Sequence, residues 1–472
     1  MNKYYLGIDL GSTTSKAIII NERDEIIGRG ITNTRANYKI AAEIAKLEAI
    51  FDARFFLLTQ KLEDEMNDKP VLRKYIDDIR AAFQYLQFKR RLDKLAATLR
   101  KTVPAYSSIL KEGVAECLEN IIATMGPIIR RDFLDGDLGS QNQFFRDIVS
   151  EQFNMEVEKV PKKYFELLML AFDKSINPVE NEMIEFDFKE LVFDAMALLK
   201  LKYNGTVEAA LEEKSVDFNA ELNLLKGNHQ EIFDSLTEYI SQIAEKKIQI
   251  ANMVGTGYGR ALLPFPDDSI KSEILCHAFG AHAVFPDTRT VLDIGGQDTK
   301  AIQVDSYGLV TSFHMNDRCA AGCGRYLGYI ADEFSISINE LGPLALNSQR
   351  ETNICSTCTV FAGAEVRELL NVGEKREDIL AGLHRAIVTR AMSLLARSGG
   401  VRNEFTFTGG VARNPAVLKY VKEMVSNSYG DHIKMNIHTD SIFMGALGAA
   451  MFAKRNIEVI LPERKKKARA TV

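Results

Sequence analysis

The sequence predicts an α/β protein with two similar lobes and a large, mostly α-helical insertion. Residues 4–18 (YYLGIDLGSTTSKAI) and 291–304 (VLDIGGQDTKAIQV) are two copies of one short pattern. In each copy an apolar strand ends in an Asp, small or hydroxyl residues follow, and Lys-Ala-Ile resumes a strand. Between the copies, apolar residues recur mainly at helical spacing. We therefore expect two β-hairpins, here called the first and second clasp, one in each lobe of a duplicated domain.

Length and composition are those of a globular protein with more than one domain. The chain has 472 residues, and two or three domains are expected for that length. A formal net charge of −5 gives no electrostatic basis for nucleic-acid binding. Because no apolar run reaches about 18 residues and no signal-peptide pattern begins the chain, we expect a soluble, cytoplasmic protein without a membrane partner.

The order of predicted elements divides the chain into four parts. Residues 1–33 form strands that begin the two-lobed core, and residues 34–246 are the helical insertion, broken at prolines such as Pro127 and Pro178. Residues 247–455 return to alternating strands and helices, and residues 456–472 are a frayed basic tail. The insertion shows no catalytic pattern, which favours a scaffold or docking role, but its function cannot be assigned from the sequence.

The first clasp is predicted to bind phosphate. Backbone N–H groups at its glycine-containing tip could surround phosphate oxygens, and the hydroxyl groups there add donors. Asp9 ends the strand and could hold Mg²⁺ through water, because Mg²⁺ keeps most of its water ligands. Glycine and hydroxyl residues also form ordinary turns, so one hairpin alone is weak evidence. The predicted phosphate ligands are Gly11, Ser12, Thr13, Thr14 and Lys16.

The second clasp repeats the spacing of the first. Asp293 lies seven residues before Lys300, as Asp9 lies seven before Lys16. Polar residues on the second turn could orient the attacking water, because phosphoryl transfer depends mainly on positioning and charge neutralisation; stabilising the turn is their alternative role. The predicted catalytic residues are Asp9, Asp293, Gln297 and Asp298. The predicted phosphate ligands of this clasp are Gly295, Gly296 and Lys300.

A third element, FTFTGGVARN, is an apolar strand that ends in two glycines before a helix. Glycines there let the backbone approach a flat ring, which suits adenosine. The predicted adenosine-binding residues are Gly409, Gly410 and Asn414. The three elements, in this order, resemble the actin, hexokinase and Hsp70 ATPase superfamily over residues 1–33 and about 247–455. That resemblance implies ATP and Mg²⁺ between two lobes.

Four of the six cysteines lie within 40 residues, as C-x3-C and C-x2-C. In a reducing compartment this clustering favours metal or iron–sulfur ligation over disulfides. Each pair falls at a predicted helix N-terminus, which stabilises thiolates. Sulfur ligands suit an iron–sulfur cluster or structural Zn²⁺, with inert buried thiols as a third possibility. The clustered residues are Cys319, Cys323, Cys355 and Cys358, whereas Cys117 and Cys276 are expected to be structural thiols.

The segments around these cysteines, NDRCAAGCGRYLG and CSTCTVFAGAEV, resemble the two cysteine motifs of the BadF/BadG/BcrA/BcrD ATPase family. GTGYGR, EILCHAFGA and DIGGQDTKAI resemble other segments of that family. The resemblance implies a [4Fe–4S] cluster at a dimer interface, to which each subunit gives two cysteines, here Cys319 and Cys358. Cys323 and Cys355 are additional, so a cluster held by all four in one chain stays open.

The family includes activators of 2-hydroxyacyl-CoA dehydratases and the ATPase subunits of benzoyl-CoA reductase. The long insertion resembles the larger ATPase subunit of benzoyl-CoA reductase, and a dehydratase activator is the alternative. The resemblance implies a second ATPase subunit, partner subunits that bind acyl-CoA, and ferredoxin or flavodoxin as the electron donor. A small-molecule kinase and a nucleotide-dependent scaffold are rivals from other classes. Glu365, in AGAEV, could transmit a conformational change or be an ordinary surface carboxylate.

Overall fold

The computed structural model describes residues 3–34, 37–65, 69–106, 111–136, 144–203, 229–262, 267–316, 324–334, 336–350, 352–354 and 359–469. The chain forms two compact units, one of Met1–Ile50 with Gln249–Val472 and one of Phe51–Ile248. The boundary lies inside helix α1 (Tyr38–Glu65). We expected the insertion to begin earlier, at residue 34. The division of the chain into domains stays a prediction.

The first sheet contains the first clasp. Its strands are β1 (Tyr4–Leu10), β2 (Thr14–Ile20), β3 (Ile26–Asn33) and β4 (Ile250–Thr256), in the order β3-β2-β1-β4. β1 and β2 form an antiparallel hairpin that pairs Asp9 with Lys16. β4 runs parallel to β1 and brings Thr256 beside Asp9. Residues far apart in the sequence therefore meet where these strands end.

The second sheet repeats this arrangement. Its strands are β5 (Thr290–Ile294), β6 (Thr299–Val304), β7 (Val310–Asn316), β8 (Phe405–Thr408) and β9 (Met435–Asn436), in the order β7-β6-β5-β8-β9. The hairpin pairs Asp293 with Lys300, and parallel β8 places Thr408 beside Asp293. The directions and neighbours of the first four strands match those of the first sheet. The predicted duplication of an α/β lobe is confirmed.

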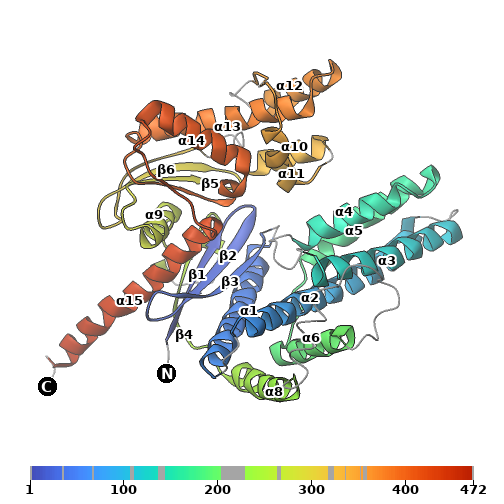
Figure 1. Cartoon of the computed structure of the whole chain (residues 1–472), viewed down its shortest axis with the longest axis horizontal. Helices are drawn as coiled ribbons and strands as arrows, with labels where there is room; N and C mark the ends of the chain where they lie inside the picture. Colours follow the sequence, from blue (N-terminus) through green and yellow to red (C-terminus); the bar gives the residue numbers. More distant parts are fainter. Residues whose placement is uncertain are drawn as a thin grey trace. The chain divides into compact units, whose positions relative to one another are not determined.

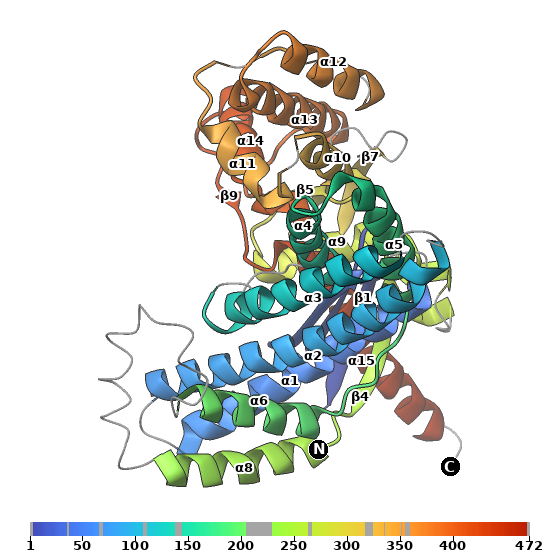
Figure 2. The same ribbon diagram turned by 90° about the vertical axis from the view of Figure 1, so that its right-hand side faces the viewer.

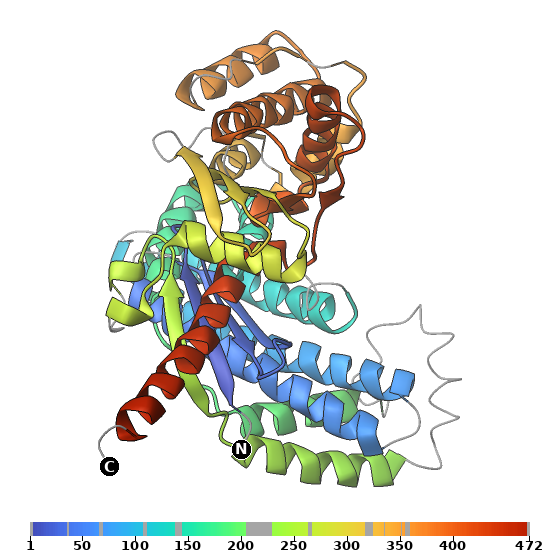
Figure 3. The same cartoon turned by 90° about the vertical axis from the view of Figure 1, so that its left-hand side faces the viewer.

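Two helices cover opposite faces of the first sheet (Figure 3). An added Cβ on Gly7 would collide with α15 (Met444–Arg469), and one on Gly30 would collide with α1. Gly30 pairs with Ala17, which pairs with Ile8, the neighbour of Gly7. Since successive strand residues face opposite sides, the two glycines open opposite faces to a helix.

Helices also cover both faces of the second sheet (Figure 1). Ala278 and Ala281 of α9 (Glu273–Val284) pack against Val291 and Ile302 on one face. The helices in the core of the other face are α10 (Gly324–Phe334), α11 (Ile338–Leu346), α12 (Thr359–Asn371), α13 (Arg376–Ser398) and α14 (Pro415–Tyr429). The short 3-10 helices among the described residues are η1 (Arg260–Leu262), η2 (Asp267–Ser269), η3 (Gly410–Arg413) and η4 (Ser441–Phe443).

Helix α9 also packs closely against α15. An added Cβ on Gly280 would collide with the carbonyl of Met444, and one on Gly448 with the carbonyl of Cys276. Cys276 belongs to the core that α15 forms with the first sheet, while Ala278 belongs to the core of the second. α9 therefore contributes to both lobes of this unit.

The second unit is helical, as predicted (Figure 2). Besides the remainder of α1, it contains α2 (Lys69–Tyr106), α3 (Lys111–Leu134), α4 (Phe145–Val157), α5 (Lys162–Glu180), α6 (Phe188–Tyr203) and α8 (His229–Glu245). The breaks expected at Pro127 and Pro178 are wrong, because α3 and α5 continue through both. Buried Ile129 and Phe133 hold α3 beyond its proline, and α5 ends two residues after Pro178.

The C-terminal tail and helix α13 of the first unit both differ from what their composition alone suggests. The predicted frayed tail, residues 456–472, is helical as far as Arg469, because α15 continues into it; Glu, Lys and Arg are good helix formers as well as solvated charges. Among the described residues, α13 alone is long and apolar enough to cross a membrane. Most of its apolar window is buried in the core of the second sheet, which is typical of a core helix.

Candidate functional site

The structure brings the tips of the two clasps together. Gly296 of the second tip lies so close to Thr13 of the first that an added Cβ would collide with the Thr13 side chain. Thr34 fixes the first tip, because its hydroxyl donates to Gly11 O at 2.6 Å and its N–H to Thr13 O at 2.9 Å. The N–H of Gly295 donates to Asp298 O at 2.9 Å and closes the second tip. The predicted phosphate ligands of both clasps thus lie at one place.

Asp9 has spare hydrogen-bonding capacity. The residue is 1% exposed, and Lys16 Nζ lies 3.3 Å from its Oδ2. Its Oδ1 is buried and has no hydrogen-bond partner among the described residues. A buried carboxylate oxygen without a partner is costly, and a ligand that donates to it removes that cost. Water bound to Mg²⁺ is such a donor, so Asp9 fits the predicted magnesium site.

Asp293, its counterpart, is surrounded by partners. Lys300 Nζ lies 3.2 Å from Oδ2, and the Thr408 hydroxyl donates to Oδ1 at 3.0 Å. His277 Nδ1 lies 3.2 Å from the same Oδ1. Burial would raise the pKa of Asp293, but the charges of His277 and Lys300 outweigh it and hold that pKa well below its usual range. Asp293 is therefore a fixed anion within a network.

Lys300 is the centre of that network. It is 1% exposed, and its ammonium group lies 2.8 Å from both Asp298 and Glu273, as well as 3.2 Å from Asp293. Burial lowers the pKa of Lys300, but the three carboxylates more than compensate and raise it well above its usual value. Burial raises the pKa of Asp298, and Lys300 opposes that shift. Asp298 thus helps to hold the turn, while Gln297 is half-buried at the tip, and the catalytic roles of both stay predictions.

Four residues of this site were missed from the sequence. Glu273 and His277 project from one face of α9, where they are four residues apart; with Asp9, each places a ligand atom within 4.8 Å of the others. Thr256 ends β4 and Gly257 follows it, as Thr408 ends β8 and Gly409 follows it. Both glycines have φ of 89°, a conformation that favours glycine. The shared Thr-Gly dipeptide was the signal that could have revealed the second pair.

The adenosine motif is only partly open to a ligand. Gly409 must be glycine, because an added Cβ would collide with Ile294 O, whereas the nearest atom to a Cβ on Gly410 is Ile442 Cδ1 at 3.5 Å. Asn414 Oδ1 accepts from the N–H groups of Ala416 and Val417 and caps α14. Its amide nitrogen donates to His384 at 3.0 Å. The Asn414 side chain thus has a structural role, and its contact with adenosine stays a prediction.

The four clustered cysteines, Cys319, Cys323, Cys355 and Cys358, lie outside the described residues. The helices that follow them are described: α10 begins at Gly324 and α12 at Thr359, each directly after a cysteine. The N–H of Gly324 donates to Gly295 O at 2.9 Å, and that of Arg325 to Gly296 O at 2.8 Å. The start of α10 is therefore bonded directly to the tip of the second clasp.

Helix α12 is tied to α10. Arg367 Nη1 donates to the hydroxyl of Tyr329 at 2.9 Å and to Glu333 at 2.7 Å, and a Cβ on Gly363 would lie 3.2 Å from the Tyr329 ring. Glu365 is half-buried on the same helix, and its role stays a prediction. The two helices that follow the cysteine segments are therefore side by side.

The remaining cysteines have ordinary structural surroundings. Cys276 is fully buried, and burial raises the pKa of its thiol to about 12. Cys117 is half-buried and packs against the core of the helical unit. Both observations agree with the structural roles expected from the sequence.

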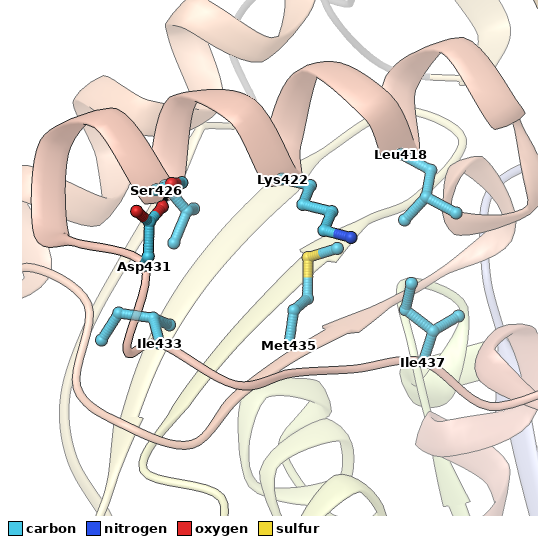
Figure 4. A pocket seen from close by; sticks show the side chains of 8 residues that line it. Leu418, Lys422, Ser426, Asp431, Ile433, Met435 and Ile437 are labelled. Carbon is cyan, nitrogen blue, oxygen red and sulfur yellow. Dashed lines mark hydrogen bonds between the residues drawn. The ribbon is translucent and has the colours of Figure 1, made fainter.

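A separate cavity of about 400 Å³ lies between α14 and the chain around β9 (Figure 4). Leu418, Val425, Ile433 and Met435 give it an apolar lining, with Lys422 at its side. No residue of either clasp lines it. The cavity therefore takes no part in the site formed by the clasp tips.

A family model for the BadF/BadG/BcrA/BcrD ATPase family matches residues 6–453. The chain belongs to the BadF/BadG/BcrA/BcrD ATPase family. The match spans both clasps and the segment between them, and it confirms the resemblance noted in the sequence. Membership in an ATPase family implies that the chain binds ATP, for which the paired clasp tips are the candidate site.

Curated relatives match less than half of this chain. The 2-hydroxyisocaproyl-CoA dehydratase activator of Clostridioides difficile is 42% identical over 204 residues, which are 43% of this chain and 74% of the relative. The (R)-2-hydroxyglutaryl-CoA dehydratase activating ATPase of Acidaminococcus fermentans is 40% identical over 46% of this chain and 81% of its own length. One subunit of the benzoyl-CoA reductase of Thauera aromatica is 33% identical over 37% of this chain and 62% of its own length. The activators are thus the more similar of these relatives.

Two solved structures are similar as well. The 2-hydroxyisocaproyl-CoA dehydratase activator from Clostridium difficile with bound ADPNP has 36% identity and a TM-score of 0.43, and covers 50% of this chain and 84% of that chain. Component A of the Acidaminococcus fermentans (R)-2-hydroxyglutaryl-CoA dehydratase has 22% identity and a TM-score of 0.48, and covers 96% and 98%.

Proposed function

We propose that this chain is an ATP-hydrolysing iron–sulfur protein that delivers low-potential electrons to a partner enzyme acting on an acyl-CoA. Activation of a 2-hydroxyacyl-CoA dehydratase takes first place, because relatives named as such activators are 40% and 42% identical. The benzoyl-CoA reductase role, which the long insertion first suggested, becomes the second candidate, supported by the 33% identity to one component of that reductase.

Mg²⁺ and ATP would be held between the clasps. Asp9, whose Oδ1 is buried without a hydrogen-bond partner among the described residues, would accept from Mg²⁺-bound water. Backbone N–H groups of residues 11–14 and of Gly296 would surround the phosphates, whereas the N–H of Gly295 is already bonded to Asp298 O. Lys16 would balance the phosphate charge. Gly410 would face the adenosine. ATP hydrolysis then depends on how these groups orient water and stabilise the developing charge.

The observation that carries the proposal is the pair of hydrogen bonds between the second clasp and α10. Gly295 O and Gly296 O accept from the first two N–H groups of that helix. A shift of this tip when the γ-phosphate leaves would therefore move the start of α10, which follows Cys323 in the sequence. Packed interfaces convert such small shifts into discrete rearrangements. ATP hydrolysis would thus be coupled to the cysteine segments.

Cys319 and Cys358 are the proposed cluster ligands, and Cys323 and Cys355 are the additional candidates. Four thiolates fit a [4Fe–4S] cluster, which when bound carries one electron at low potential. Arg367 of α12 bonds to Tyr329 and Glu333 of α10, so the helices that follow both cysteine segments are in contact. A cluster shared with a second ATPase subunit, reduced by ferredoxin or flavodoxin, is part of this proposal.

Anaerobic purification tests the proposal directly. We expect the visible absorbance of an iron–sulfur cluster, stoichiometric iron and sulfide, and Mg²⁺-dependent ATP hydrolysis. Cys319→Ala and Cys358→Ala should lose the absorbance, and Cys117→Ala is the control that should keep it. A colourless protein with tightly bound zinc, or one that phosphorylates a small molecule, would refute the electron-transfer function.

Co-purification from the native source separates the two candidates. Recovery as a homodimer, which then activates a separately purified dehydratase, supports the activator role. Recovery with a second ATPase subunit and two acyl-CoA-binding subunits, identified by mass spectrometry, supports the reductase role. The acyl-CoA itself is identified by testing the reconstituted system on a panel of thioesters.

A further inference from the structure

Helix α9 presents two polar side chains to both clasps. Glu273 and His277 are four residues apart and lie on one face of the helix. The other faces of α9 make apolar contacts with the second sheet and close glycine contacts with α15. Polar residues in so packed a place need partners, and the partners are the clasp residues.

His277 lies between the two clasp aspartates. The imidazole is 4% exposed, with Nδ1 at 3.2 Å from Asp293 Oδ1. On the other side of the ring, a Cβ on Gly445 would lie 2.8 Å from Nε2 and 3.1 Å from Asp9 Oδ2. A ligand atom of His277 and one of Asp9 lie within 4.8 Å. One side chain therefore reaches the acid of each clasp.

Glu273 attaches α9 to the second clasp and lies near this histidine. Its Oε1 lies 2.8 Å from Lys300 Nζ and 3.8 Å from His277 Nε2. The helix therefore contacts the second clasp through two residues, Glu273 with Lys300 and His277 with Asp293. Lys300 in turn contacts Asp293. The glycine contact with α15 leaves α9 little freedom to move relative to the first lobe.

The charges around His277 indicate that the cluster is built around a cation. Asp9, Asp293, Asp298 and Glu273 contribute four carboxylates, and Lys16 and Lys300 contribute two ammonium groups, which leaves −2 before His277 is counted. Burial lowers the pKa of His277, but Asp293 raises it by more, so a protonated imidazole brings the cluster to −1. An uncompensated negative charge is expensive in a buried site, and a cation near Asp9 would offset it.

We propose that His277 is a positioning residue for the ATPase reaction, which fixes the separation of Asp9 and Asp293 so that both clasps face one hydrated Mg²⁺. Glu273 orients it. The inference rests on the proposed Mg²⁺–ATP site and assigns α9 as a third element of that site. Without the imidazole, the two carboxylates relax away from each other, and the cation binds less tightly at the moment of reaction.

Three substitutions of His277 separate its two contacts. His277→Asn keeps an amide near the position of Nδ1 and preserves the contact with Asp293. His277→Gln keeps one near Nε2 and preserves the side that faces Asp9, whereas His277→Ala removes both. We expect kcat to fall about tenfold or more in the Ala variant and less in the other two. The Mg²⁺ concentration for half-maximal activity should rise several-fold, with the KM for ATP within about twofold of wild type.

Leu275→Ala is the matched control, because this residue lies on the same helix and is 42% exposed. It should leave kcat, the Mg²⁺ requirement and thermal stability unchanged. Should His277→Ala fail to fold, the Asn and Gln variants and Glu273→Gln carry the test. An unchanged kcat and Mg²⁺ requirement overturn the inference, and so does a parallel loss of kcat, ATP affinity and stability, which a purely structural role would give. Absence of Mg²⁺-dependent hydrolysis in wild type would instead refute the proposed function.

Discussion

The two clasps share a topology but differ in how their aspartates are satisfied. Asp293 has Lys300 and Thr408 as hydrogen-bond partners and His277 Nδ1 at 3.2 Å, whereas Asp9 has Lys16 and an Oδ1 without a hydrogen-bond partner among the described residues. The difference begins with the neighbouring threonines. Thr408 donates to the carboxylate of its own clasp, but the equivalent Thr256 donates to the carbonyl of Lys271 at 3.0 Å.

The two hairpins therefore share a backbone arrangement, and the neighbouring side chains determine the environment of each aspartate. The same Asp-to-Lys spacing gives one acid that is locked into a charge network and one that keeps an oxygen for a ligand. We infer a division of labour in which Asp293 anchors the site and Asp9 faces the cation. The following three predictions would break or sharpen that contrast.

Replacing each aspartate by asparagine is the strongest of these tests. Asp293→Asn leaves Lys300 and His277 with less compensation in a buried site, and we expect the free energy of unfolding to fall by about 3 kcal/mol. Asp9→Asn should cost about 1 kcal/mol or less, because it removes one weakly paired charge, yet abolish Mg²⁺-dependent ATP hydrolysis. Urea unfolding and ATPase assays measure both effects. Equal losses of stability would show that the two acids are equivalent.

The two glycines after the central strands give the next largest effect. Gly257 and Gly409 both have φ of 89°, so alanine at either position should cost about 1–2 kcal/mol from backbone strain alone, and collisions add to it. Gly257→Ala should also reduce ATP hydrolysis, because its Cβ would lie 2.5 Å from Asp9 Oδ1. Thermal unfolding measures the stability, with Gly410→Ala as the control for that measurement. If Gly257→Ala leaves hydrolysis intact, Asp9 does not face the cation.

The smallest expected effect is a pH dependence of stability that arises from His384, in the lobe of the second clasp. Burial lowers the pKa of His384 from 6.5 to about 4 in the folded chain. As the pH falls, the unfolded state takes up this proton first, so the contribution to stability is complete above pH 6.5 and is lost progressively down to about pH 4. Between pH 7 and 5.5 the loss should be about 1 kcal/mol. Urea unfolding of wild type and His384→Gln at both pH values measures it; an unchanged pH dependence in the variant would contradict the prediction.

The tautomer of His384 follows from its neighbours. Because Asn414 Oδ1 accepts two backbone N–H groups, its amide nitrogen faces His384 and donates to Nε2. Nδ1 therefore carries the proton and donates to Leu380 O at 2.6 Å. Both nitrogens are satisfied only in the neutral imidazole, which together with burial keeps the proton off the second nitrogen.

The strand pairing of both clasps could be predicted from the sequence, because the Asp-to-Lys spacing is repeated within the chain and can be recognised without knowledge of the fold. The roles of Glu273 and His277 could not. Two polar residues four apart occur on the solvent face of many helices, and only the packing of α9 between two lobes makes these two meet the clasps.

The cap at the start of α14 could be predicted from the sequence, whereas the course of α3 could not. An Asn directly before Pro415 is a common helix N-cap, so the structural role of Asn414 was visible in the sequence. The continuation of α3 through Pro127 was not, because the packing of Ile129 and Phe133 that compensates the lost hydrogen bond is a property of the folded unit. The cysteine motifs gave the family, and the comparison with the family model confirmed it.

The contact between α9 and α15 has a mechanical consequence. Gly280 and Gly448 bring the two backbones so close that neither position admits a side chain. One helix belongs to the core of the first sheet and the other adds to the core of the second, so this contact is where the lobes are joined. Close-packed backbones leave little room for relative displacement. A movement of one lobe against the other would therefore be smallest at this pair of glycines and would grow with distance from it.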